Sequence, residues 1–177
     1  MKTRFALKAA TDDVHRELDD RLSRLDLALE ADYRRFLQIH ARAVPAIEGA
    51  LAQSGVGQVI GEWEQNRRSE ALESDLATLG EDMPDEAAKP PIEGTAEMLG
   101  MAYVLEGSRL GGRVLKKRVG NGFPMEFLNR SNDLAGWTSL IAVMDEALYS
   151  ESLLGEAQRA AQRCFALFLK VTREAGV

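Results

Sequence analysis

The residues best suited to chemistry share one face of an expected N-terminal helix. The chain has only two histidines, and histidine is the commonest metal-ligating side chain. His15 has Asp19 four residues ahead, with Thr11 four and Lys8 seven residues behind, all at helical spacing. A carboxylate that accepts the N–H of one ring nitrogen leaves the other more basic for a metal ion. The alternative is a surface histidine with an ordinary acidic neighbour, which spacing alone favours. His40 has no such neighbours and is interpreted as structural.

A second unusual stretch is "LEGSRLGGRVL", residues 105–115, with glycines at Gly107, Gly111 and Gly112. Each glycine inside a helix costs about 1 kcal/mol relative to alanine. One interpretation is that the helix bends over a flat ligand and lets its backbone approach that ligand closely. The other is close packing of two helices. This stretch alone does not decide between them.

The elements that must position these residues are helices. Apolar residues recur at helical spacing, and no run of β-branched and aromatic residues alternates at period two. Asp32 is expected to cap the second helix, Pro45 to kink it, and the three glycines to break the fourth. We therefore predict an all-α, single-domain bundle over 1–177, with helices at 3–26, 32–53, 59–79, 94–119, 132–148 and 151–175, and a loop at 80–94.

Composition narrows the possible functions. The 177 residues carry a net charge of −6, which argues against general nucleic-acid binding. No apolar run approaches the roughly 20 residues of a membrane span, and the N-terminus does not resemble a signal peptide. The single cysteine, Cys164, fits a reducing cytoplasm. The basic run Arg113, Lys116, Lys117 and Arg118 is either a solvated helix end or a docking patch for an acidic electron donor.

Two segments together are more specific than either alone. "LKAATDDVH" near the N-terminus and "YVLEGSRLGGRVL" in the middle of the chain resemble the haem oxygenase family. The likeness is closer to the bacterial biliverdin-forming enzymes associated with bacteriophytochromes. It extends over most of the chain, to the apolar final helix "AQRCFALFLK". The fold that the resemblance implies is a haem-oxygenase-like bundle with a kinked, glycine-rich distal helix.

The resemblance implies roles for individual residues. His15 matches the proximal iron ligand, Asp19 its carboxylate partner and Lys8 a lysine that pairs with a haem propionate. The remaining haem-binding positions that it implies are Thr11, Gly107, Gly111, Gly112, Phe165 and Phe168. The implied reaction converts haem, which is both substrate and cofactor, to biliverdin, carbon monoxide and ferrous iron. Dioxygen and a donor such as ferredoxin or a reductase are required, and a bacteriophytochrome is a candidate receiver of biliverdin.

Two departures from the family pattern leave questions open. Where many members have a distal aspartate, this chain has Ser108, which we expect to act with Gly107 and Gly111 in catalysis. The later segment "GWTSLIAVMDE" also lacks the basic residues that bind propionates in the animal enzymes. Arg109, expected to point outward, with Arg113 and Lys116 are candidate substitutes. The alternatives are a non-catalytic haem-binding or sensory protein of the same fold, and a helical interaction domain without haem.

Overall fold

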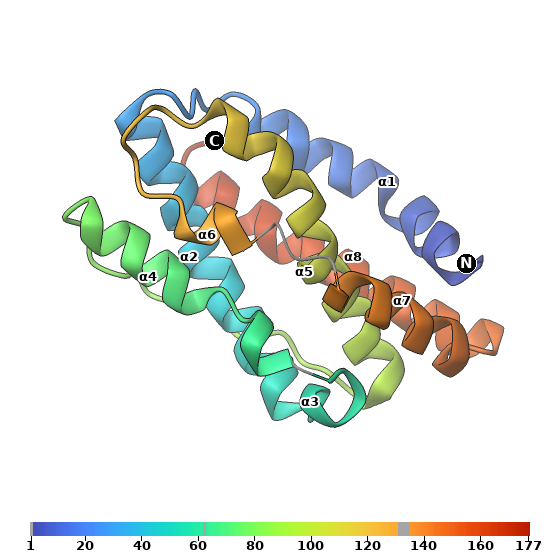
Figure 1. The fold of residues 1–177 in the computed structure, drawn as a ribbon. Helices are drawn as coiled ribbons and strands as arrows, with labels where there is room; N and C mark the ends of the chain where they lie inside the picture. Colours follow the sequence, from blue (N-terminus) through green and yellow to red (C-terminus); the bar gives the residue numbers. More distant parts are fainter. Residues whose placement is uncertain (1, 62, 131–134) are drawn as a thin grey trace.

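The computed structural model describes residues 2–61, 63–130 and 135–177, and this part of the chain contains helices and no strand (Figure 1). The all-α prediction is therefore confirmed. The α-helices are α1 (Lys2–Leu22), α2 (Glu30–Gln53), α3 (Val56–Val59), α4 (Ser69–Thr78), α5 (Gly94–Leu115), α6 (Glu126–Asn129), α7 (Ala135–Ala147) and α8 (Glu151–Glu174). Two 3₁₀ turns are η1 (Trp63–Asn66) and η2 (Lys116–Arg118).

The last helix, α8, is the element on which the others assemble. Helices α1, α2 and α5 all pack against it, as Figure 1 shows around the C-terminal helix in red. Its buried face includes the small residues Ala157, Ala160, Ala161 and Cys164, which let neighbouring backbones come close. The two segments singled out in the sequence lie on α1 and α5, and both of these helices pack against α8.

The predicted third helix, 59–79, is wrong in its first half. The structure has α3, η1 and then α4, which starts only at Ser69. The buried carboxylate of Glu48 on α2 explains the late start. It accepts the backbone N–H of Arg68 at 2.7 Å and that of Ser69 at 3.3 Å, so it binds the first amide groups of α4 from outside the helix.

Two other predictions differ from the structure, the cap of the second helix and the break in the fourth. The N-cap of α2 is Leu29, while Asp32 accepts the backbone N–H of Asp26 at 2.9 Å instead. Helix α5 continues through its glycines to Leu115, so the glycines do not break it. Pro45 lies inside α2. The predicted start at 132 of the next helix lies outside the described residues. The loop at 80–93 contains no helix, as predicted.

None of the helices in the described ranges is long and apolar enough to cross a membrane.

Candidate active site

The histidine of α1 has the neighbour that its spacing predicts. The Nε2 atom of His15 lies 3.4 Å from an oxygen of Asp19, and both side chains are more than half exposed. The imidazole ring also lies against Phe165 of α8, with 5.2 Å between ring centroids. His15 is therefore contacted on two sides, by Asp19 through Nε2 and by the Phe165 ring, while its side chain stays more than half exposed.

The two residues behind His15 are placed differently from each other. Lys8 is 68% exposed and pairs with Asp12 at 3.5 Å. Thr11 is buried, and its hydroxyl donates to the Leu7 carbonyl at 2.9 Å. Lys8 thus carries an exposed charge with one carboxylate neighbour, whereas the hydroxyl of Thr11 is satisfied within its own helix.

The two phenylalanines of α8 contact different histidines. Phe165 and Phe168 are both buried, and Phe168 lies 5.9 Å from the ring of His40. The Nδ1 atom of His40 lies 2.8 Å from the Phe36 carbonyl oxygen, and the ring also packs against Phe36 and Phe127. Burial lowers the pKa of His40 to about 4, helped by the positive charge of Arg68. His40 is thus a neutral packing residue, as predicted.

The glycine segment of α5 forms an uncovered apolar stripe. Gly107, Leu110, Gly111 and Val114 are spaced at three, four and seven residues and so share one helical face. Leu110 is 40% exposed and Val114 is 64% exposed. A Cβ built at Gly111 would meet no atom within 4 Å beyond its own helix, and one at Gly107 would only touch the ring of Trp137. The packing interpretation therefore fails for Gly111. Gly112, the neighbouring predicted position, is buried.

Close helix packing is instead the role of a different glycine, which the sequence analysis did not single out. A Cβ at Gly100 would come within 2.1 Å of the Ala157 carbonyl oxygen. This contact is the close crossing of α5 and α8. It holds the helix that carries the uncovered stripe.

The prediction that Arg109 points outward is wrong. Its side chain is buried and forms an ion pair with Glu106 at 2.8 Å. It also donates to the carbonyl groups of Arg130, at 2.7 Å, and Asn66. Glu106 and Arg109 are three residues apart on the same helix, so their opposite charges pair, and this pairing allows both side chains to be buried. Arg109 therefore ties α5 to η1 and to the end of α6, and it is not available to a propionate.

Ser108 lies on the exposed side of α5 but contacts a buried residue. Its hydroxyl donates to the Leu105 carbonyl at 2.7 Å and accepts from Arg68 at 2.8 Å. Nothing in the sequence pattern marked Arg68, because it lies 40 residues away along the chain.

The basic run is less free than its sequence suggests. Arg118 donates to the Leu25 carbonyl at 3.0 Å and so fastens η2 to the connection between α1 and α2. Lys117 and Arg113 are exposed, and Lys116 is half-buried.

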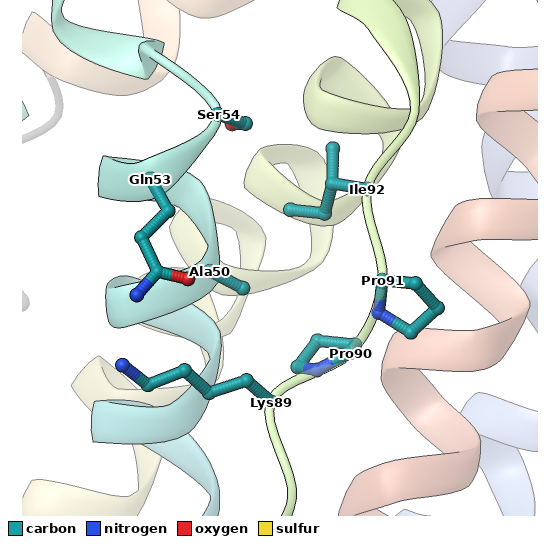
Figure 2. A pocket seen from close by; sticks show the side chains of 7 residues that line it. All are labelled: Ala50, Gln53, Ser54, Lys89, Pro90, Pro91 and Ile92. Carbon is teal, nitrogen blue, oxygen red and sulfur yellow. The ribbon is translucent and has the colours of Figure 1, made fainter.

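A shallow pocket lies elsewhere, between the end of α2 and the proline segment (Figure 2). It is lined by Ala50, Gln53, Ser54, Lys89, Pro90, Pro91 and Ile92. None of these is a predicted site residue, and none carries an imidazole, thiolate or carboxylate that could ligate iron.

The chain was compared with family models, solved structures and curated proteins. No family model matches the chain. Among solved structures, it is similar to the NO- and CO-bound haem oxygenase from Neisseria meningitidis. The TM-score is 0.82 at 23% sequence identity, and the match covers 98% of this chain and 91% of that one. The fold is therefore that of the haem oxygenases.

Sequence similarity goes further than fold. The chain is 35% identical over 147 residues to a haem oxygenase from Xanthomonas campestris pv. campestris, covering 79% of this chain and 88% of the relative. The chain belongs to the haem oxygenase family, whose members are oxidoreductases that degrade haem.

Proposed function

We propose that this chain binds haem between α1 and α5 and, with dioxygen and electrons, converts it to biliverdin, carbon monoxide and ferrous iron. Family membership supports the reaction class. The residues present on α1 and α5 support the mode of binding.

On α1, the donor set suits a haem iron. His15 offers one imidazole, and Asp19 at 3.4 Å can accept the N–H of the ring nitrogen that does not bind the metal. Such a carboxylate fixes the tautomer and makes the ligating nitrogen more basic. Phe165 restricts how the imidazole can tilt.

On α5, the uncovered stripe suits the flat face of a porphyrin, and this observation carries the proposal. Exposed apolar residues at Leu110 and Val114 cost free energy in water, at roughly 25 cal/mol per Å². An apolar ligand that covers them recovers that energy. The open space at Gly111 lets the ligand approach the backbone, which a side chain would prevent.

Bound haem supplies an iron centre that activates dioxygen and a ring whose meso carbon is oxidised. The chain's own residues orient the ring, exclude water from its apolar faces and hold a hydrogen-bonding group beside the iron. Gly111 leaves open space, Gly107 lies beside the Trp137 ring, and Ser108 is the hydrogen-bonding side chain between them along the helix.

Lys8 is the proposed partner of a propionate. It lies seven residues, or about 10 Å along the helix axis, from His15. That separation is about the distance between a haem iron and its propionates. Because Arg109 is buried in its ion pair, Arg113 and Lys116 remain as further candidates, and the biliverdin isomer depends on which of them engages.

Electrons are proposed to enter from an acidic donor such as ferredoxin or a reductase, in the cytoplasm. Arg113 in the last turn of α5 and Lys117 in η2 are exposed and offer the complementary charge. A bacteriophytochrome is the proposed receiver of biliverdin, following the sequence resemblance.

The test is a hemin titration followed by a single turnover. The protein should develop a Soret band at one hemin per chain. Ascorbate, or ferredoxin with its reductase, should then produce bilin absorbance and release ferrous iron to a chelator. A stable oxygenated complex that returns to ferric haem without bilin would overturn the enzyme proposal and support a non-catalytic haem-binding protein. Absence of a Soret band would overturn both.

A further inference from the structure

The proposed site has a second layer on its distal side, centred on a buried arginine. Arg68 is 2% exposed, and Glu48 accepts its backbone N–H. The same carboxylate accepts both the N–H and the hydroxyl of Ser69. The backbone of Arg68 is therefore fixed to α2 before its side chain makes any contact with α5.

The guanidinium of Arg68 reaches α5 with one nitrogen. Its Nη2 donates to the Leu105 carbonyl at 2.9 Å and to the Ser108 hydroxyl at 2.8 Å. Its carbon lies 5.1 Å from the centre of the Phe127 ring, a cation–π distance. Arg68 therefore joins two helices. Its backbone is held by Glu48 of α2, and its side chain binds Leu105 and Ser108 of α5.

The charge of Arg68 has no carboxylate in contact with it among the described residues. Glu48 is engaged by backbone amides, and Glu106 is paired with Arg109, which itself repels Arg68. His40, the titratable group nearby on α2, is neutral. The Nε atom of Arg68 is buried and has no hydrogen-bond partner within the part of the chain that the structure describes. Taking a guanidinium out of water costs several kcal/mol, and the negative charges of Glu106 and Glu48 offset only part of that cost because neither carboxylate contacts it among the described residues.

The contacts of Arg68 also fix the hydrogen-bonding direction of Ser108. A hydroxyl has one hydrogen and two lone pairs. The hydrogen is given to Leu105 and one lone pair accepts from Arg68, so a single lone pair remains on the exposed side. A water or ligand that meets Ser108 must therefore donate to it.

We propose that Arg68 is a positioning residue of the distal side: it holds the Ser108 hydroxyl as an acceptor and supplies a positive charge beside the haem pocket. This inference rests on the proposed function. In place of a distal carboxylate, the chain presents an oriented neutral acceptor backed by a cation. A water held there points one hydrogen at Ser108 and has its other hydrogen free for the ligand side, and the nearby cation makes that water more acidic.

The C–O stretching band of the ferrous carbon monoxide complex tests both parts. Its frequency falls with positive potential near the ligand, and its width reports how many arrangements the distal side adopts. We expect one narrow band in the wild type. Arg68→Met should raise the frequency and broaden or split the band. Arg68→Lys should keep the frequency but broaden the band, since it retains the charge without the planar fork. Ser108→Ala should likewise keep the frequency and broaden the band, because the charge of Arg68 remains while the oriented hydroxyl is lost.

Arg67→Met is the matched control. Arg67 precedes Arg68 and contacts Glu48 and Glu64, but makes no contact with Ser108. Its band should equal that of the wild type. If Arg68→Met does not fold, Arg68→Lys and Ser108→Ala decide the question through band width. Unchanged width in both, or an equal change in Arg67→Met, would overturn the inference. A wild type without a Soret band would instead defeat the proposed function.

Discussion

The two walls of the proposed site are held in opposite ways. On α5, the glycine segment is fixed from behind by buried contacts: Gly100 lies against Ala157, Glu106 binds Arg109, and Arg68 reaches Ser108. On α1, His15 and Lys8 are exposed, and the carboxylates that they pair with lie one turn away on the same helix. The α5 side of the proposed site is thus held in place by the packing of the fold, whereas His15 and Lys8 on α1 are exposed when no ligand is bound. Substitutions behind α5 should therefore reduce stability, and those on α1 should reduce haem affinity.

The largest expected effect on stability separates two glycines of the same helix. Gly100→Ala places a methyl group 2.1 Å from a backbone carbonyl oxygen, so α5 and α8 must move apart. The free energy of unfolding should fall by about 3 kcal/mol, as overpacking typically costs. Urea unfolding of the protein without haem measures this change.

Gly111→Ala is the matched control for that experiment. Its methyl group meets nothing beyond its own helix, and alanine favours helix, so stability should rise by about 0.5–1 kcal/mol. Haem affinity should fall at the same time because the methyl group enters the proposed pocket. Equal destabilisation by both substitutions would contradict the distinction between a packing glycine and a ligand-facing one.

His40 gives the next effect, which depends on pH. Its pKa is about 4 in the fold and about 6.5 in an unfolded chain, so the unfolded state binds more protons between these values. Its contribution to stability is present above pH 6.5 and is lost as the pH falls toward 4. Between pH 7 and pH 5 the loss is about 2 kcal/mol.

His40→Leu should remove this part of the pH dependence. The difference between unfolding free energies at pH 7 and pH 5 should be smaller in the variant than in the wild type. The same substitution at the exposed His15 is the control for removing an imidazole from the surface instead of from the core. An undiminished difference in His40→Leu would show that other groups account for the acid sensitivity.

Lys8→Glu should give the smallest effect, and on affinity alone. An exposed charge contributes little in water, so we expect haem affinity to fall by about 1 kcal/mol while unfolding of the haem-free protein changes by less than about 0.5 kcal/mol. The biliverdin isomer ratio should also change if Lys8 fixes the rotation of the ring in its plane. Arg4→Glu is the control, because Arg4 is also on α1 but its guanidinium lies 5.1 Å from the centre of the Phe5 ring. An unaltered affinity and isomer ratio would leave Lys8 as a solvated charge.

The sequence predicted what local spacing controls. The helical fold and the His15–Asp19 pair follow from periodicity within one element. Long-range contacts were not predictable in this way. Glu48 stops the expected third helix from starting early by binding backbone amides 20 residues away, and Arg109 is drawn inward by segments that meet only in the fold. Thr11 shares a helical face with His15 by spacing, yet the packing of α1 buries it.

The exchange of roles among glycines has the same origin. Three glycines close together in "EGSRLGG" drew attention, while Gly100 stood alone in an ordinary helical pattern. Only the position of α8 shows that Gly100 is the packing residue and that Gly111 faces open space. Arg68 likewise carried no sequence signal, because its partners lie on another helix.

The most direct test of the account is the ferric haem spectrum of His15→Ala beside that of His40→Ala. We predict that His15→Ala loses the native Soret and visible bands, that added imidazole partly restores them, and that His40→Ala keeps them. Circular dichroism should show that both variants stay folded. A native spectrum in His15→Ala, or its loss in His40→Ala with the fold intact, would contradict the assignment of His15 as the iron ligand.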